Sequence, residues 1–183
     1  MLPVLVLLVI AFGAVAGLGV RELSARPSAG GQTTVAPTST APAGPPPGSS
    51  SVQLSPDAAA HPAAEEIRVL LQRHFDAINS LDYAAWASTV VARRSAEMPR
   101  KAWEAAYEST RDGSILVHRI EPAPDGHVVL MSFVSTQDAD KAPANLQGST
   151  CTRWWVSYRV VTESRVPRID AGDRHSSLNA DCS

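Results

Sequence analysis

A regular alternation of apolar and polar side chains makes residues 151–162 the clearest strand of the chain. Within this segment the even-numbered positions are apolar and the odd-numbered ones are mostly polar, which is typical of a strand with one buried face. The apolar positions are Trp154, Val156, Tyr158 and Val160. Burial of one large side chain contributes about 1.5–3 kcal/mol, so the two aromatic residues predict a central place for this strand.

Three helices are predicted before the first strand. The first begins near Glu65, because the apolar residues that follow recur with the i, i+3, i+4 spacing of a helix with one buried stripe. These residues are Ile67, Leu70, Leu71, Phe75 and Ile78. The second helix is expected over residues 83–91 and the third over residues 100–110, with Gly113 placed to end the third. Asp82 precedes the second helix, where a carboxylate caps free backbone N–H groups; a catalytic base is its alternative role.

The rest of the chain is predicted to form strands joined by polar loops. Besides the central strand, we expect strands over residues 114–121, 127–136 and 166–171, and a Pro-Ala-Pro-Asp-Gly turn at 122–126 joins the first two. Pro167 cannot donate a backbone hydrogen bond, so the last strand is expected at an edge of the sheet. Helices followed by strands predict an α+β fold, with three N-terminal helices packed on an antiparallel sheet of about four strands.

Two segments of different composition come before this part of the chain. Residues 1–20 are apolar and carry no charge, and a helix of this length spans about 30 Å of hydrocarbon, so we assign residues 1–22 to a single transmembrane helix in the lipid bilayer. A cleaved signal peptide, followed by secretion, is the alternative. Residues 23–62 hold eight prolines and few large apolar side chains, which predicts a disordered stalk. Residues 63–183 then form the folded domain, and a chain beginning near Ala59 is expected to keep its stability.

The orientation of the anchor depends on opposing signals. Arg21 and Arg26 follow the apolar run and favour a cytoplasmic C-terminal side. The stalk and the cysteine pair favour an extracytoplasmic one, which we expect. Gly13 and Gly17 form a Gly-x-x-x-Gly pattern that lets two such helices approach closely, so a homodimer is one further expectation.

Cys151 and Cys182 are the only cysteines of the chain. An even count in an extracytoplasmic domain favours a disulfide, and the bridge would tie a C-terminal tail to the start of the central strand. That tail has only Leu178 as a large apolar side chain, so it would otherwise fray. Two free thiols and an intermolecular bridge are the alternatives.

Composition and charge argue against two classes of function. Lys and Arg total 16 and Asp and Glu total 18, so there is no basic surplus for a nucleic-acid partner. His118, His127 and His175 are widely spaced and show no metal-binding pattern. We therefore expect no nucleic acid, no metal and no cofactor. The basic residues are mostly Arg, which we attribute to the coding bias of a GC-rich bacterial genome.

The order of the predicted elements resembles a known family. Three helices, a hairpin and two further strands, with Asp-Tyr-x-x-Trp at 82–86 and Trp-Trp-Val-x-Tyr at 154–158, are similar to the nuclear transport factor 2-like superfamily over residues 63–172. An anchor and a stalk before such a domain also resemble actinobacterial Mce-associated membrane proteins. The resemblance implies a cone, in which a curved sheet wraps around the long first helix and leaves a cavity. It does not specify function, because this cone serves isomerases, dehydratases, polyketide cyclases and non-catalytic binding modules.

Three residues are the candidate ligand-binding residues of that cavity. Trp154 and Tyr158 lie on the buried face of the central strand and can donate hydrogen bonds. His74 lies on the apolar stripe of the first helix, where either a hydrogen bond to a backbone carbonyl or a role in the pocket is expected. An isomerase or cyclase also needs a carboxylate base beside such donors. The carboxylates that we considered fall opposite the apolar stripe, at a helix cap or in a loop: Asp76, Asp82, Asp138 and Asp140. No catalytic residue is therefore assigned.

The leading hypothesis is a membrane-anchored, extracytoplasmic, non-catalytic binding or accessory module of a bacterial cell envelope. Its partner would be a lipid-like ligand or an envelope protein, and its role would support lipid transport. An isomerase-type or cyclase-type enzyme that uses the cavity is the first alternative, and a structural assembly or spacer subunit is the second. A cavity free of carboxylates would favour binding, whereas a buried Asp or Glu within reach of Tyr158 would favour the enzyme.

Overall fold

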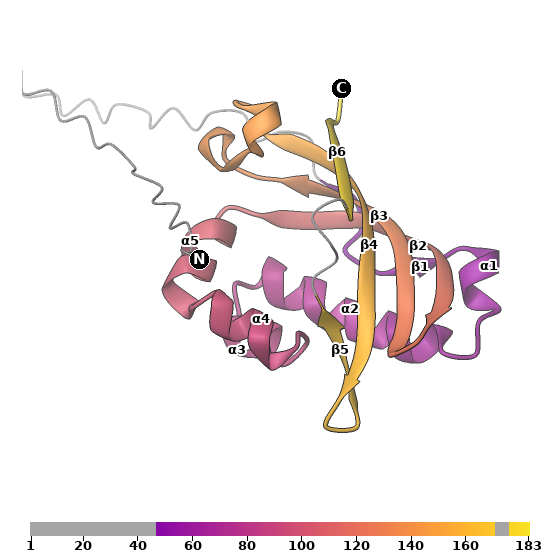
Figure 1. The fold of residues 1–183 in the computed structure, drawn as a ribbon. Helices are drawn as coiled ribbons and strands as arrows, with labels where there is room; N and C mark the ends of the chain where they lie inside the picture. The colour runs from indigo at the N-terminus through magenta and orange to yellow at the C-terminus, as the bar shows by residue number, and fades with distance from the viewer. Residues whose placement is uncertain (1–46, 171–175) are drawn as a thin grey trace, which may run out of the picture. The chain divides into compact units, whose positions relative to one another are not determined.

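The computed structural model describes residues 47–170 and 176–183, which form an α+β fold (Figure 1). In chain order its α-helices and strands are β1 (Gln53–Leu54), α1 (Pro56–Ala59), α2 (Ala64–Asn79), α3 (Tyr83–Ala87), α4 (Ala92–Glu97), α5 (Arg100–Tyr107), β2 (Arg111–Ala123), β3 (Gly126–Thr136), β4 (Cys151–Glu163), β5 (Val166–Asp170) and β6 (Ser177–Asp181). Two short 3-10 helices, Ala139–Lys141 and Ala144–Leu146, lie between β3 and β4. The predicted anchor, the first part of the stalk, the Gly13/Gly17 pattern and His175 lie outside these residues. Within the described part of the chain, no helix is long and apolar enough to span a membrane.

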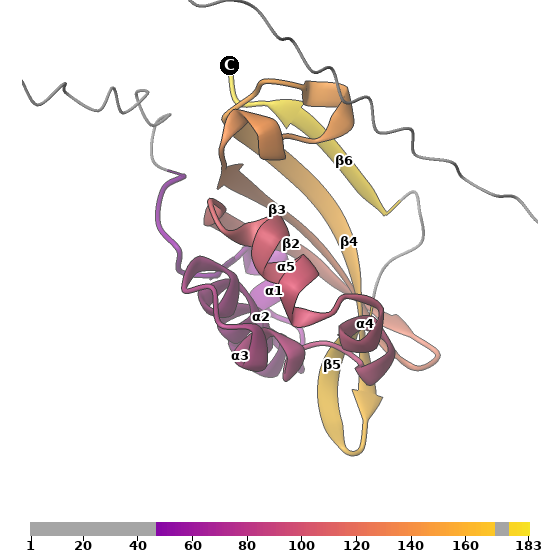
Figure 2. The same ribbon diagram turned by 90° about the vertical axis from the view of Figure 1, so that its left-hand side faces the viewer.

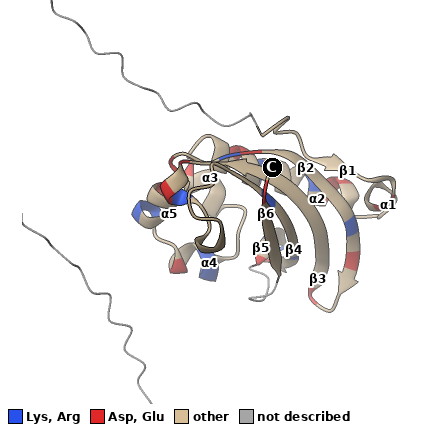
Figure 3. Ribbon diagram, turned by 90° about the horizontal axis from the view of Figure 1, so that it is seen from above, with Lys and Arg blue, Asp and Glu red and all other residues tan. Residues whose placement is uncertain are grey.

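The strands form one mixed sheet in the order β1-β2-β3-β4-β5, and β6 pairs with β4 as well. Neighbours from β2 to β5 are antiparallel, but β1 runs parallel to β2. The predicted antiparallel sheet of about four strands is thus corrected to a mixed sheet of six strands within the described residues. Figure 2 shows the helices gathered on one side of this sheet, and Figure 3 shows that acidic and basic residues are interspersed along the elements.

Helix α2 carries the apolar stripe that the spacing predicts. Ile67, Leu71 and Phe75 are each no more than 1% exposed and belong to the core between helix and sheet. The N-cap of the next helix is also confirmed, because the Asp82 Oδ1 accepts a hydrogen bond from the Ala85 N–H at 3.0 Å. Asp82 is therefore engaged in capping, as the first of its two interpretations predicts.

The later helices differ from the prediction. Helix α3 ends at Ala87, a separate α4 follows it, and α5 ends at Tyr107. Gly113 does not end a helix, because it lies within β2. A Cβ there would sit 2.6 Å from the carbonyl oxygen of Gly48, while the Ser114 N–H donates to the Ser49 carbonyl at 2.8 Å. The glycine is needed where an earlier segment crosses the strand closely.

The alternation predicted for β4 is present. Val156 and Val160 are buried, Trp154 and Tyr158 are half-buried on the same face, and Trp155 on the opposite face is 42% exposed. The β2–β3 hairpin is confirmed as well. Among the described strands β5 pairs only with β4, so its edge position is confirmed; on its other side it makes a single parallel bridge to Val90.

The C-terminal tail is a strand rather than a frayed end. Strand β6 pairs with β4 from Thr152 to Val156, directly beside the disulfide that joins Cys151 to Cys182. The predicted pairing of the two cysteines is therefore seen. Closing a loop over a sequence separation of 31 stabilises a fold by about 3–4 kcal/mol in the chain-entropy account, and here it also holds β6 against the sheet.

The folded domain begins earlier than residue 63. Val52 is 3% exposed and its N–H donates to the Gln72 Oε1 at 2.8 Å, while Ala58 is fully buried. The Ser55 N–H donates to the Val117 carbonyl at 2.9 Å. Residues 47–62 are thus part of the domain, and the predicted stalk boundary at residue 62 is wrong. The Pro-rich composition of this segment predicts disorder, and β1, with two residues, is too short to show the alternation that predicts a strand.

We therefore predict that a chain starting at Ala63 is less stable than one starting at Pro47. It loses the burial of Val52 and three or more hydrogen bonds, so its free energy of unfolding should fall by at least about 3 kcal/mol. Urea unfolding of the two purified chains measures the difference. Equal unfolding midpoints would show that residues 47–62 do not pack on the domain.

Candidate functional site

A cavity of about 580 Å³ lies between the helices and the inner face of the sheet. Its apolar wall consists mainly of aromatic side chains: Phe75, Tyr107, Phe133, Trp154 and Tyr158, with Ile78 and Val156. Its polar wall is made of His74, Arg94, Thr110, Asp112, Ser135, Gln137, Lys141, Ser176 and Ser177. Apolar walls with a few polar groups and a volume of about 300–1,000 Å³ are typical of small-molecule sites.

The three candidate residues of the sequence all line this cavity. Trp154 and Tyr158 reach it from β4, and His74 reaches it from α2. The ring of His74 meets that of Tyr158 edge to face at 6.3 Å between centroids, and Phe133 stacks on Trp154 at 6.3 Å. The three residues thus share the wall of one cavity, and their role in ligand binding stays a prediction.

His74 is held in one tautomer by a chain of two hydrogen bonds. The Thr89 Oγ1 lies 2.7 Å from the His74 Nδ1 and donates its own proton to the Trp86 carbonyl at 2.7 Å. The hydroxyl must then accept from Nδ1–H, so the Nε2 of His74 carries a free lone pair. Burial lowers the pKa of His74 to about 3, and the charge of Arg94 acts in the same direction. A neutral imidazole that accepts hydrogen bonds therefore faces the cavity.

Asp112 corrects the prediction that no carboxylate lines the cavity. It lies on β2, is 4% exposed, and its Oδ1 accepts a hydrogen bond from the Ser135 hydroxyl at 2.5 Å. Asn79 fixes its backbone from both sides, at 2.7 Å to the N–H and 2.9 Å to the carbonyl. Burial raises the pKa of Asp112 to about 6, although the Ser135 hydrogen bond opposes the shift. This residue can be neutral or ionised near physiological pH.

Two tyrosine hydroxyls complete the polar groups of the site. Burial raises the pKa of Tyr158 and of Tyr107 above the ordinary tyrosine range, while the charge of Arg94 opposes both shifts. Both phenols therefore stay protonated and can donate. Neither hydroxyl has a hydrogen-bond partner among the described residues, so each is available to a bound molecule.

Among the described residues, the histidines outside the cavity make contacts elsewhere. The His118 Nε2 lies 2.8 Å from the Ser132 hydroxyl, and the ring of His127 contacts that of His61 at 5.1 Å. Across residues 47–170 and 176–183, no group of three or more His, Cys, Asp or Glu side chains is placed to hold a metal ion.

Comparison with known proteins gives no relative for this chain. No family model matches it, and neither a curated protein nor a solved structure is significantly similar to it. We therefore infer function from the geometry and chemistry of the cavity.

We predict that Asp112→Asn changes how stability depends on pH. The fold raises the pKa of this carboxyl from 3.8 to about 6, so its contribution to stability is full below about pH 4 and is lost as the pH rises through about 6. Between about pH 4.5 and about pH 7.5 the loss is roughly 2 kcal/mol at 1.36 kcal/mol per pKa unit. The stability of the wild type relative to the variant should fall by that amount.

Urea unfolding at both pH values measures this difference. Asp138→Asn is the matched control, because Asp138 is an exposed loop residue that lies outside the cavity. His74 contributes with the opposite sign, since its stabilisation is full above about pH 6.5 and is lost as the pH falls toward 3; comparing wild type with variant cancels it. Parallel profiles for the wild type and Asp112→Asn would contradict a raised pKa.

Proposed function

We propose that the protein is a non-catalytic binding module that takes a lipid-like molecule into its cavity. The observation that carries this proposal is an aromatic cavity of about 580 Å³ whose wall presents polar groups without protein partners. The hydroxyls of Tyr107 and Tyr158 and the His74 Nε2 are of this kind among the described residues. Burial of the apolar part of the ligand supplies the driving force for binding, and these polar groups orient the polar end of the ligand.

The proposal also includes a cellular location and a protein family. The disulfide supports an oxidising compartment, and the apolar run at residues 1–20 supports a membrane anchor, so we place the domain outside the cytoplasm in a cell envelope, in support of lipid transport. A long helix packed on one face of a sheet, with a cavity between them, supports the proposed nuclear transport factor 2-like cone.

A second candidate function is favoured by Asp112. A buried carboxylate near Tyr158 is the feature expected of an isomerase or cyclase. Asp112 shares the cavity wall with Tyr158 and is one of the charges that raise the pKa of Tyr158. In such a reaction Asp112 would remove a proton beside a carbonyl, and Tyr158 would donate a hydrogen bond to the enolate oxygen. Because an enzyme must also bind its substrate, this second candidate adds turnover to the binding proposal.

The binding proposal predicts that a bulky side chain at the cavity wall blocks ligand uptake. Ala106 lines the cavity from α5 and is exposed, so Ala106→Trp should occupy ligand space without disturbing the core. Decanol binding, measured by calorimetry, should weaken at least tenfold. Ala102→Trp is the control, because Ala102 lies on the same helix, is exposed and does not line the cavity. Equal affinity in the two variants would remove the cavity as the binding site.

The enzyme candidate predicts turnover of a β,γ-unsaturated ketone, which becomes the conjugated enone when a proton moves from the α to the γ carbon. The absorbance of the enone follows the reaction. Asp112→Asn should lower the rate by at least about 10²-fold, since general-base catalysis contributes about 10²–10⁴-fold. If the wild type shows no turnover, or if the variant equals it, the second candidate is withdrawn and binding alone remains.

A further inference from the structure

Arg94 is the one residue of α4 that lines the cavity. It is half-buried, and its charge lowers the pKa of His74, Tyr107 and Tyr158. These residues come from α2, α5 and β4, so the guanidinium acts on groups from three sides of the cavity. A positive charge thus faces the site whose apolar wall is described above.

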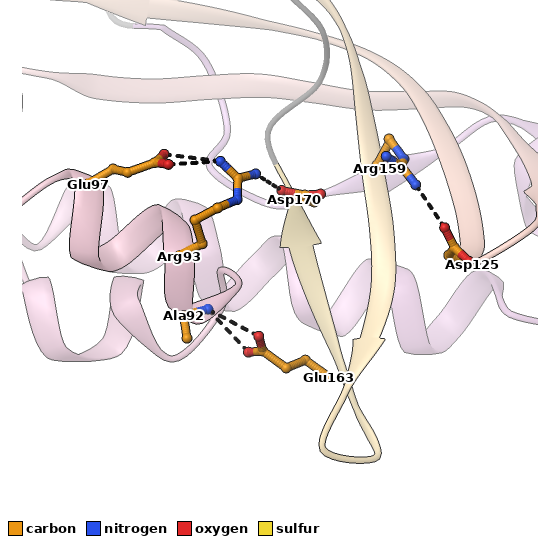
Figure 4. Close-up of polar contacts among 7 residues, drawn as sticks. All are labelled: Ala92, Arg93, Glu97, Asp125, Arg159, Glu163 and Asp170. Atoms are coloured by element: carbon orange, nitrogen blue, oxygen red, sulfur yellow. Dashed lines mark hydrogen bonds and ion pairs between the residues drawn. The ribbon is translucent and has the colours of Figure 1, made fainter.

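No described side chain neutralises this charge. The side chain of Arg94 forms no hydrogen bond or ion pair within residues 47–170 and 176–183, whereas its neighbour Arg93 pairs with Glu97 and Asp170 at 2.9 Å each (Figure 4). Lys141, the other cation of the wall, pairs with Glu108 at 2.8 Å. Asp112 bonds to Ser135, and Arg94 is not among the groups that shift its pKa. Among the residues that the structure describes, Arg94 is therefore the cation of the cavity wall without an anionic partner.

Helix α4 is fixed to the sheet, which holds Arg94 in position. The Val91 N–H donates to the Ile169 carbonyl at 3.1 Å, and the Ala92 N–H donates to the Glu163 carboxylate at 3.2 Å (Figure 4). With the Arg93–Asp170 pair, these contacts join the start of α4 to β4 and β5. A donor that is already placed loses little conformational entropy when it binds.

The chemistry of the missing partner follows from the guanidinium. A half-buried Arg at an apolar wall is stabilised by a planar or tetrahedral oxyanion, which accepts two parallel N–H bonds. We propose that the ligand of this cavity is an amphipathic anion, with a carboxylate or phosphate-monoester head on Arg94 and an apolar chain along Phe75, Phe133 and Trp154. This inference rests on the proposed binding function and specifies the class of its ligand.

Calorimetric titration with decanoate, decyl phosphate, decanol and decyltrimethylammonium, each kept below its micelle concentration, tests the head group. The wild type should bind decanoate or decyl phosphate at least tenfold more tightly than decanol, and should bind the ammonium compound least. Arg94→Gln should reduce the affinity for the anions to that for decanol and leave decanol binding unchanged, which also shows that the variant is folded. Arg153→Gln is the control, because Arg153 is exposed and does not line the cavity, and it should behave as the wild type.

The alternative outcomes are distinct. Retention of tight anion binding by Arg94→Gln, or a wild-type preference for decanol, overturns the role of Arg94 while the binding proposal stands. Absence of binding for all four compounds overturns the binding proposal, and this inference with it. Acetate and inorganic phosphate carry the same head groups without an alkyl chain. If acetate binds as tightly as decanoate, or inorganic phosphate as tightly as decyl phosphate, Arg94 binds a free anion and the proposed apolar chain of the ligand is wrong.

Discussion

The cavity depends on β4, because this strand is paired along both of its edges. Its register with β3 runs from Gly126 opposite Val161 to Thr136 opposite Cys151 without a shift. On the other edge β5 pairs with one end of β4 and β6 with the other. An unbroken register keeps alternate side chains on one face over the whole strand. Trp154, Val156 and Tyr158 therefore form a continuous wall.

The opposite wall is held by aromatic packing rather than by long helices. Tyr83, Trp86, Trp103 and Tyr107 contact one another in sequence at 5.2–5.7 Å between ring centroids. The indole N–H groups of Trp86 and Trp103 are buried without a partner among the described residues, which costs about 1–3 kcal/mol each. Each aromatic ring contact contributes about 0.5–1.5 kcal/mol beyond the burial of its area. The ring contacts of the cluster therefore offset the cost of the two unpaired N–H groups and hold α3 and α5 together.

The parts that could be predicted from the sequence are those set by local chemistry. The stripe of α2, the alternation of β4 and the Asp82 cap each depend on residues within a few positions, and the cysteine pair has no other partner in the chain. Asp112 was missed because the expected strand begins at residue 114 and Gly113 is expected to end a helix, so residue 112 falls between two predicted elements. Strand β2 in fact begins at Arg111, and its register shifts, between Gly113 and Leu116 and between Val117 and Arg119, prevent the alternation of its later residues from being extended back to Asp112. Strands β1 and β6 are defined by their partners and carry no pattern of their own.

The two candidate functions require different protonation states of one residue. Neutral Asp112 adds no negative charge to the wall of the cavity, which favours binding of an anion. Ionised Asp112 would repel an anion in the same cavity, and it is the form that a general base requires. Because the pKa of Asp112 is about 6, both forms are populated within about one pH unit of that value. Anion affinity that rises as the pH falls, and turnover that rises with pH, are therefore opposite signatures of the same carboxylate. Only the second distinguishes an enzyme from a binding module, because an enzyme must also bind its substrate.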